Sequence, residues 1–597
     1  MKGLHHRLRQ GLLAAGACAV TGLALSGTGL NATQSAESPP PAPAPAMTPA
    51  MASEPAGTAC SAALAVAWPE AGTRIERAAP VPAGLINGQM IPAHCEVFGI
   101  MHEHKGVDGQ DYAIRFHMRL PEAWNGRFFF QGGGGSNGEI GDALGRVSMV
   151  RGSAITPAIM RGYAVVSQDS GHDNQRNSNP KRGGPTAFGF DPQARSEYGH
   201  ASLAPVALAA KAIVTAFYHR PIVHSYFVGC SKGGEEGMVF AQQHPDIFDG
   251  IMAAAPGFAL PRAAVEETWE VQRLSRLLAR PVSFPAFHTA LTDQDLAIAG
   301  RAITRACDAL DGAADGMVSN VAACTTARVR PQIEASVCKA GQSDCLTRAK
   351  ADTLYDLMRG ARRPDGSAIY SDWAWDPGIA TPGWRIWKLG SSDGKVPALN
   401  IVLGGASLHT VFIVPPVEVP GDPQGLLDAE LRFNVLTDGQ KIYATGAGFT
   451  HSAWQDSSAH STDLSAFAAH GGKLIVPHGA ADPVFSLRDT LGWWQGVNAR
   501  AKGKASSFAR VFPVPGMNHC GGGDAADQFD GLAALVDWVE HGKAPASIPA
   551  KGDPQAPWPD RTRPLCAWPT YARYKGRGSF EDAANFVCTA PPSNRKA

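Results

Sequence analysis

The sequence predicts an α/β fold built on a mostly parallel sheet. Short apolar runs, each about the length of a buried strand, alternate along the chain with longer segments of helical character. Strands that alternate with helices in this way are typical of parallel sheets. A further run alternates apolar and polar residues with the period of two that a strand has. The predicted strands cover 112–120, 127–130, 163–167, 225–228, 250–255, 472–479 and 509–514, and the predicted helices cover 202–218, 235–244 and 529–540.

One long segment interrupts this rhythm. Residues 258–465 contain four cysteines, clusters of tryptophan and many Gly and Pro turns. The segment is too long for a loop, so we predict an inserted lid domain. The core would then consist of two parts, residues 60–257 and residues 466–597.

The N-terminus has the pattern of a secretory signal peptide. Three basic residues precede an apolar run over 11–25, and small residues follow it. We predict a signal peptide over 1–26 and a Pro- and Ala-rich linker over 27–59. Cys18 is an alternative lipoprotein acceptor, which would make the chain an outer-membrane lipoprotein. No other stretch reaches the roughly 18–20 apolar residues that span a bilayer.

Composition excludes some classes of protein. The 597 residues include 53 Lys and Arg against 53 Asp and Glu, and no long basic run is present, so nucleic acid is not an expected partner. Eleven cysteines are present, and ten remain when Cys18 is set aside. An even number behind a signal peptide predicts five disulfides in an oxidising compartment, secreted or periplasmic.

The segment around Ser231 has the pattern of a nucleophile elbow. Gly229 and Gly233 flank the serine in G-x-S-x-G, between the strand predicted over 225–228 and a predicted helix. Asp482 and His519 each follow a later predicted strand. The order Ser231, Asp482, His519 is that of the α/β-hydrolases, with a turn after a strand at each position. We therefore predict an α/β-hydrolase with this catalytic triad; the alternatives are a helix-capping aspartate and a structural histidine.

Two further features adjoin the predicted triad. Cys230 precedes the nucleophile and Cys520 follows the base, so the two would approach disulfide distance if Ser231 and His519 meet. An oxyanion also needs hydrogen-bond donors. We expect one from the backbone N–H of Lys232 and the other from the four glycines after the 127–130 strand, at Gly132 or Gly133.

An acidic loop in the lid is a candidate calcium site. It reads Cys307-Asp308-Ala309-Leu310-Asp311-Gly312-Ala313-Ala314-Asp315-Gly316-Met317. Oxygen-only ligands suit Ca²⁺, and the spacing is not that of an EF-hand. The proposed ligands are the side chains of Asp308, Asp311 and Asp315 and the carbonyls of Ala313 and Met317. The alternative is a solvated acidic turn.

Together these motifs resemble the tannase and feruloyl esterase family. The resemblance runs from about Cys60 to Cys588 and includes Gly-Cys-Ser-x-Gly-Gly, Asn-His-Cys, the acidic loop, 124–129, 171–174, 188–195 and 572–576. It implies the triad above, oxyanion donors at Gly132 and Lys232, and calcium in the lid. It also implies the disulfides Cys60–Cys95, Cys230–Cys520, Cys307–Cys324, Cys338–Cys345 and Cys566–Cys588.

The resemblance also implies a substrate site, and there the chain departs from its relatives. The matching positions are Leu260, Trp387, Leu399, Leu403, His478 and Phe485. Family members that cleave a terephthalate monoester pair its free carboxylate with a lid arginine. An ungapped count places Leu399 at that arginine and Leu403 at a nearby aromatic residue. Leucine makes no charge-assisted pair, and the nearby Lys388 and Lys395 are not equivalent to arginine.

These observations predict a carboxylic ester hydrolase that acts on small esters of aromatic acids, of the feruloyl, galloyl or terephthalate type, through an acyl-enzyme. One alternative is a terephthalate-monoester hydrolase with a different carboxylate contact. Others are a peptidase on the same fold and a calcium-stabilised, non-catalytic protein that binds aromatic compounds.

Overall fold

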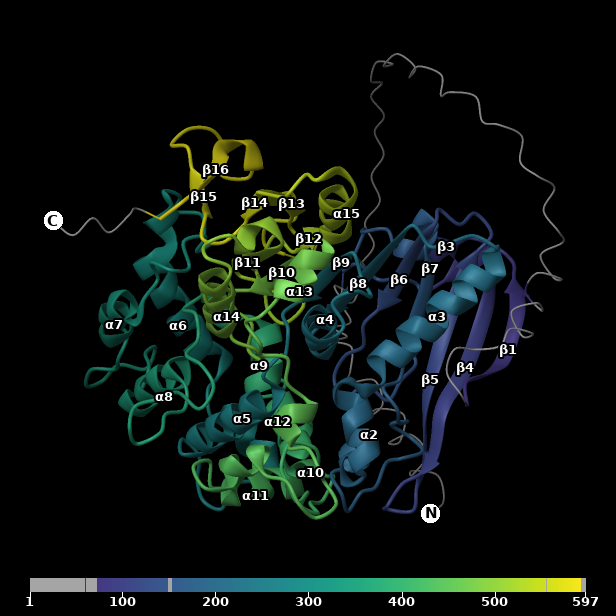
Figure 1. Cartoon of the computed structure of the whole chain (residues 1–597). Helices are drawn as coiled ribbons and strands as arrows, with labels where there is room; N and C mark the ends of the chain where they lie inside the picture. The colour runs from purple at the N-terminus through teal and green to yellow at the C-terminus, as the bar shows by residue number, and fades with distance from the viewer. Residues whose placement is uncertain (1–59, 61–71, 149–152, 555, 592–597) are drawn as a thin grey trace, which may run out of the picture.

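The computed structural model describes residues 60, 72–148, 153–554 and 556–591, so the predicted signal peptide and linker lie outside the described residues. At its centre is a nine-stranded sheet with the order β1-β4-β5-β7-β6-β8-β9-β10-β11 (Figure 1). Pairing is parallel from β7 to β11 and antiparallel among β1, β4, β5 and β7. The strands are β1 (Arg74–Val81), β4 (His94–Lys105), β5 (Asp111–Pro121), β6 (Arg127–Gln131), β7 (Ala164–Gln168), β8 (His224–Cys230), β9 (Gly250–Ala254), β10 (Lys473–Gly479) and β11 (Ala509–Val514). The α/β prediction and its strands are confirmed.

Helices cover both faces of the sheet. Because successive strand residues point to opposite faces, Phe128 and Phe130 of β6 join one apolar cluster and Phe129 joins another. The first cluster contains apolar side chains of α3 (Leu203–Tyr218), α4 (Lys232–Gln243) and α14 (Leu487–Arg500), and the second contains those of α15 (Gly531–His541). Helix α4 begins at Lys232, directly after Ser231 and three residues before the start of the helix predicted over 235–244. This places a helix N-terminus at the elbow.

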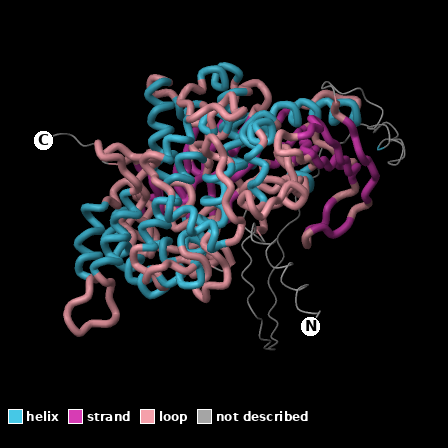
Figure 2. The backbone as a smooth tube through the Cα atoms, turned by 90° about the horizontal axis from the view of Figure 1, so that it is seen from below, coloured by secondary structure: helices cyan, strands magenta, loops and turns pink. Residues whose placement is uncertain are grey.

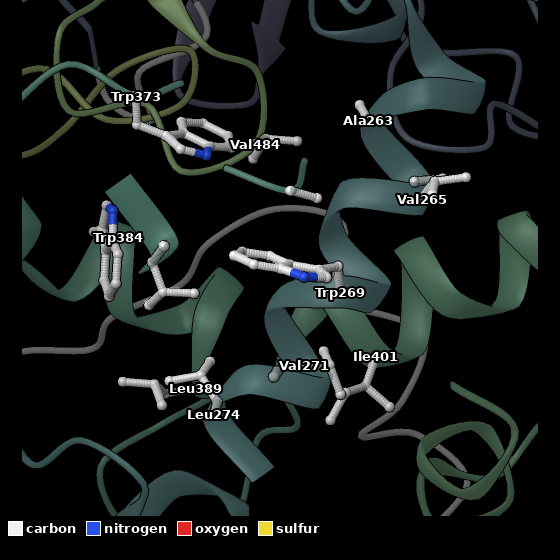
Figure 3. Close-up of a cluster of buried hydrophobic side chains, with 14 of the residues drawn as sticks. Ala263, Val265, Trp269, Val271, Leu274, Trp373, Trp384, Leu389, Ile401 and Val484 are labelled. Atoms are coloured by element: carbon white, nitrogen blue, oxygen red, sulfur yellow. The ribbon is translucent and has the colours of Figure 1, made fainter. Parts of the chain in front are cut away.

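The named elements between β9 and β10 are all helical. They supply most of another large apolar cluster, in which Trp269 and Trp384 pack among aliphatic side chains and which Val484, from after β10, also joins (Figure 3). Figure 2 shows these helices and loops gathered on the side of the molecule away from the long antiparallel strands. The α-helices of this segment are α5 (Leu260–Ser275), α6 (Asp293–Cys307), α7 (Thr326–Ala335), α8 (Arg348–Arg359), α9 (Pro382–Lys388), α10 (Ala406–Thr410), α11 (Pro423–Arg432), α12 (Ala453–Asp456) and α13 (Ser465–His470). We call this segment the insertion.

A buried ion pair connects the core to the end of the insertion. Arg195 of α2 (Pro192–Ser196) donates from Nε to Asp456 of α12 at 2.9 Å, and its Nη2 lies 2.8 Å from the same carboxylate. Both side chains are buried. A carboxylate that has left water in this way needs its cation, so the pair fixes where the insertion returns to the core.

Small antiparallel sheets complete the chain: β2 (Gly84–Ile86) with β3 (Gln89–Ile91), β12 (Gln528–Phe529) with β13 (Ser547–Lys551) and β14 (Thr562–Cys566), and β15 (Tyr571–Tyr574) with β16 (Phe586–Thr589).

The disulfides are Cys60–Cys95, Cys230–Cys520, Cys307–Cys324, Cys338–Cys345 and Cys566–Cys588, as the family resemblance implied. Five disulfides fit an extracellular or periplasmic protein. Within the described ranges no single helix is long and apolar enough to cross a membrane, although the bent pair Pro192–Ala201 and Leu203–Tyr218 meets the criteria jointly.

Candidate active site

Ser231 occupies a strained turn between β8 and α4. Its backbone has φ 65° and ψ −123°, a conformation that non-glycine residues rarely adopt. The turn is closed by glycines: a Cβ on Gly229 would lie 2.4 Å from the Gly233 carbonyl, and a Cβ on Gly233 would lie 2.5 Å from the Gly133 carbonyl. The G-x-S-x-G spacing is therefore a steric requirement of this turn, and the serine is only partly buried.

Asp482 and His519 follow β10 and β11, whose carboxyl ends lie at the same edge of the sheet as that of β8. His519 Nδ1 lies 2.8 Å from Asp482 Oδ2. The other oxygen, Oδ1, accepts the N–H groups of Val484 at 2.8 Å and Phe485 at 3.1 Å. Among the described residues His519 Nε2 has no hydrogen-bond partner. The carboxylate thus fixes the imidazole through Nδ1 and leaves Nε2 available for the serine proton.

Asp482 stays ionised although it is fully buried. Burial acts to raise its pKa, but the attraction of His519 and hydrogen bonds from His478 and His519 outweigh burial, so the pKa of Asp482 lies well below its usual range. An ionised Asp482 stabilises the imidazolium that forms when His519 takes a proton.

A disulfide joins the nucleophile turn to the base turn. Cys230 and Cys520 have Cα atoms 6.0 Å apart and are 290 residues apart in the chain. Each is the immediate neighbour of a predicted catalytic residue. Cys520, like Ser231, has a positive φ, of 63°. The bond therefore holds two turns with unusual backbone geometry against each other.

The insertion helps to hold the base turn. Asp376 accepts the N–H of Gly516 at 3.1 Å, and Thr381 donates to the Asn518 side chain at 2.7 Å. A Cβ on Gly383 would lie 2.3 Å from Asn518 Oδ1, so this contact requires glycine. Residues of the insertion, which sequence reasoning did not single out here, thus position the turn that carries His519.

The glycine loop after β6 requires a correction. It packs on the elbow, but the Gly132 N–H donates to the Val228 carbonyl at 2.9 Å, which extends the β6–β8 ladder. The Gly133 N–H donates to Glu236 Oε2 at 3.0 Å. An N–H that is already engaged cannot also hold an oxyanion, so the Gly132 assignment does not fit this structure. Lys232 begins α4, and its N–H belongs to the first turn, where the helix offers no acceptor.

A buried polar cluster beneath the elbow escaped the sequence analysis. Lys232 Nζ donates to Glu235 at 2.7 Å and lies 3.5 Å from Glu236. Glu236 also accepts from Asn137 Nδ2 at 2.8 Å. Burial disfavours the charged lysine, but the two glutamates outweigh it and raise the pKa of Lys232. Through Glu236, the helix after the nucleophile holds the glycine loop in place.

Three of the predicted substrate residues lie together beside His519. The rings of Trp387 and Phe485 meet the His519 ring edge-on, with centroids 5.5 and 5.4 Å away. A Cβ on Gly257 would touch both Phe485 and Leu260, and the Gly257 N–H donates to the Ser231 carbonyl at 3.1 Å. We call Leu260, Trp387 and Phe485 the apolar wall.

His478 lies behind the site and does not face it. It is fully buried, and its ring nitrogens lie 2.9 Å from Thr490 Oγ1 and 2.9 Å from the Phe485 carbonyl. Its Nε2 is also 3.5 Å from Asp482. The substrate-binding assignment of His478 therefore does not fit this structure: with both nitrogens occupied, its ring supports the turn that carries Asp482.

The residues expected at the distal end of the substrate site lie around η7, the π-helical turn Asn400–Gly405. Leu399 is buried directly before it, and Leu403 lies within it, half-buried. Lys388 is buried and ion-paired with Glu270. Lys395 is 82% exposed and pairs with Asp393. Neither lysine is free to take the place of a carboxylate-binding arginine.

The acidic loop turns its side chains toward its own backbone. Asp308 accepts the N–H groups of residues 315 and 316, Asp311 accepts those of 313 and 319, and Asp315 accepts that of 317. Asp315 also pairs with Arg563. Within the residues described, no group of three or more His, Cys, Asp or Glu side chains is arranged to hold a metal ion. Burial raises the pKa of Asp311 to about 6 despite hydrogen bonds from the loop, and Asp315 adds to this rise.

Comparison with known proteins agrees with this geometry. A family model described as tannase and feruloyl esterase matches residues 95–589. The chain is 41% identical over 550 residues to mono(2-hydroxyethyl) terephthalate hydrolase of Piscinibacter sakaiensis, covering 88% of this chain and 90% of that protein. It is 30% identical over 496 residues to a probable feruloyl esterase of Arthroderma benhamiae, covering 81% and 84%.

Solved structures show the same fold. Feruloyl esterase B from Aspergillus oryzae superposes with a TM-score of 0.70 at 23% identity, over 89% of this chain and all of that one. Tannin acyl hydrolase from Aspergillus niger superposes with a TM-score of 0.60 at 19% identity, over 89% of this chain and 95% of that one.

Proposed function

Because this chain belongs to the tannase and feruloyl esterase family and is a carboxylic ester hydrolase, we propose that it cleaves esters of aromatic acids through an acyl-enzyme on Ser231. The observation that carries the proposal is the His519–Asp482 pair at 2.8 Å, beside a disulfide that binds the His519 turn to the serine turn. The apolar wall next to His519 suits an aromatic group.

In this mechanism His519 Nε2 takes the proton of Ser231 as the serine oxygen attacks the ester carbonyl. The Lys232 N–H, at the positive end of α4, stabilises the oxyanion. The second donor is the Gly134 N–H, for which the described residues provide no backbone acceptor. His519 then protonates the leaving alcohol and activates the water that releases the acid.

Ser231→Ala tests the proposal. The variant should keep its fold and its circular dichroism spectrum but lose hydrolysis of p-nitrophenyl esters and labelling by a fluorophosphonate. Unchanged turnover would refute the assignment of Ser231. Labelling of the wild type without hydrolysis of any aromatic ester would refute the substrate class, and cleavage of a peptide-amide panel would favour a peptidase.

We also propose that terephthalate monoesters are poor substrates. A 41% identical relative carries that substrate in its name. Here, however, an ungapped count places Leu399 and Leu403 at the corresponding lid positions, and Lys388 is already paired with Glu270. Loss of a charge-assisted bond of ~1.5–3 kcal/mol lowers affinity roughly ten- to over a hundred-fold. We expect Leu399→Arg to raise kcat/KM for mono(2-hydroxyethyl) terephthalate relative to methyl ferulate; a wild type that prefers the terephthalate ester would contradict this argument.

Calcium in the acidic loop remains a proposal. It is supported by the oxygen-only donors and by the repulsion of Asp308 and of Asp311 by Asp315, which a divalent cation would relieve. The carbonyls of Ala313 and Met317 would complete the shell, and the ion would be structural. EGTA should lower the Tm, and added CaCl₂ should restore it; identical melting curves would exclude a stabilising calcium ion.

We propose export through the signal peptide at 1–26, with lipid attachment at Cys18 as the alternative. Mass spectrometry of the mature N-terminus distinguishes cleavage near residue 26 from a diacylated Cys18.

A further inference from the structure

Asn518 connects the turn that carries Asp482 to the turn that carries His519. It directly precedes His519, and its side-chain Nδ2 donates to the carbonyl of Ala481, the residue directly before Asp482, at 3.3 Å. The backbones of the two turns also meet, because the Ala481 N–H donates to the Met517 carbonyl at 3.1 Å. The Asn518 amide is therefore a side-chain bridge between the immediate neighbours of Asp482 and His519.

The same amide reaches the insertion. Its Nδ2 lies 3.4 Å from the Gly378 carbonyl, in η6 (Pro377–Ala380), and its Oδ1 accepts the Thr381 hydroxyl at 2.7 Å. The orientation of the amide is fixed by these partners, because an amide turned over would place its oxygen against the carbonyls of Gly378 and Ala481. Asn518 is only 2% exposed, so its bonds form away from solvent.

Thr381 uses its hydroxyl for this contact. It stands at the N-cap of α9, but its side chain makes no capping hydrogen bond. A threonine at this position usually accepts an N–H of the first helical turn. Here the hydroxyl lies within hydrogen-bond distance of two other acceptors, Asn518 Oδ1 and, at 2.6 Å, the Gly378 carbonyl. Helix α9 also carries Trp387 of the apolar wall, so the contact joins the helix of Trp387 to the turn of His519.

The insertion backbone packs directly on both turns. A Cβ on Gly378 would lie 2.5 Å from the Ala481 Cβ and 2.8 Å from the Gly516 carbonyl oxygen. The 2.8 Å contact between His519 and Asp482 therefore depends on how two turns and η6 fit together, and the Asn518 amide lies where all three meet.

We infer that Asn518 is a positioning residue for the Asp482–His519 pair, and that the insertion acts on catalysis through it. Both amide hydrogens of Asn518 have protein acceptors, so its effect is exerted through the two turns. The inference rests on the proposed function and deepens it, since it names the group that holds acid and base together. A misplacement of about 1 Å in a reacting group lowers rate by roughly 10²-fold, which sets the scale of the expected effect.

Asn518→Ala removes the bridge and the contact with the insertion together. Its kcat on a p-nitrophenyl ester should fall about a hundredfold, with little change in KM. The acid limb of the profile of kcat/KM against pH should also move to lower pH. The base must be neutral to accept the serine proton, and an Asp482 farther from His519 stabilises the imidazolium less. Asp482 keeps its other neighbour, His478 at 3.5 Å, in this variant. A residue that only supports the fold would leave the acid limb in place.

Thr381→Val tests the part played by the insertion. It removes the hydroxyl without loss of a capping bond and should lower kcat roughly three- to ten-fold, the effect of one hydrogen bond. Thr381→Ser, which keeps the hydroxyl, should restore most of this loss. Thr353→Val is the matched control, because Thr353 is also buried in the insertion but bonds the Ala349 carbonyl within α8, at 2.9 Å. In the Asn518→Ala background Thr381→Val should have no further effect, whereas additive losses would contradict an action through Asn518.

A kcat of Asn518→Ala within about threefold of the wild type, or an acid limb that does not move, would overturn the inference. If Asn518→Ala does not fold, the Thr381 variants decide, and equal kcat values for Thr381→Val, Thr381→Ser and the wild type would overturn it. Variants that match a wild type active on the ester defeat this inference alone. A wild type that cleaves no ester defeats the proposed function, and this inference with it.

Discussion

Gly233→Ala probes how the elbow and the glycine loop depend on each other. The added Cβ would lie 2.5 Å from the Gly133 carbonyl oxygen, 3.1 Å from the Gly132 carbonyl carbon and 3.2 Å from the Gly133 nitrogen. All three atoms belong to the backbone, so no side chain can rotate away. Either the glycine loop or α4 must move.

The required movement follows from these distances. Ordinary van der Waals contact begins at 3.4 Å, so the Gly133 carbonyl must retreat by 3.4 − 2.5 = 0.9 Å. A retreat of that size stretches the 3.0 Å bond between Gly133 and Glu236. It also displaces the N–H groups that follow in the loop. A misplacement of about 1 Å lowers rate by roughly 10²-fold, similar to the loss of one oxyanion donor.

The assay is kcat on a p-nitrophenyl ester, with fluorophosphonate labelling to confirm that Ser231 remains reactive. Gly492→Ala in α14 is the control, because a Cβ there meets nothing within 4 Å and alanine favours a helix by about 0.5–1 kcal/mol. We expect kcat to fall about a hundredfold for Gly233→Ala and to stay unchanged for the control. A kcat within about threefold of wild type would show that the loop does not position the oxyanion.

Further predictions concern stability. Arg195→Met leaves Asp456 buried without its cation and should lower the free energy of unfolding by about 3–5 kcal/mol in urea titrations. Burial, followed by the repulsion of Glu270, raises the pKa of Glu266 from 4.5 to about 8. The contribution of Glu266 to folding stability is therefore complete below pH 4.5 and is lost as pH rises through 8. Glu266→Gln, which cannot ionise, should raise the Tm at about pH 9 more than at about pH 5. Replacing Cys230 and Cys520 by alanine should lower the free energy of unfolding by roughly 2–5 kcal/mol and should also lower kcat. A loss of stability with kcat unchanged would show that the disulfide does not contribute to catalysis.

The parts of the site that a short sequence motif determines could be predicted from the sequence. An apolar strand ending in G-x-S-x-G indicates both the turn and the helix after it. Gly229 is required by a contact within the motif, with the Gly233 carbonyl, whereas Gly233 itself is required by the distant Gly133 carbonyl. Asp482 and His519 follow strands in the same way.

Which N–H of the glycine loop is free was not predictable. The sequence marks the loop, but the engagement of Gly132 depends on the register of β6 against β8, nearly a hundred residues later in the chain. His478 illustrates the same limit. It lies near Asp482 in the sequence, but only its contact with Thr490 of α14 shows that a ring nitrogen is already engaged. Glu236 belongs to no motif, so its contact with the glycine loop could not be predicted.

The Cys230–Cys520 bond also bears on how the protein must be made. Four of the five disulfides join cysteines 7 to 35 residues apart, whereas this one spans 290 and encloses Cys307–Cys324 and Cys338–Cys345. During synthesis the Cys230 thiol emerges long before its partner and stays unpaired while four other thiols appear. Each of these is a wrong partner within reach of thiol–disulfide exchange. Recombinant yield of active enzyme should therefore depend on a disulfide isomerase more than on an oxidising environment alone.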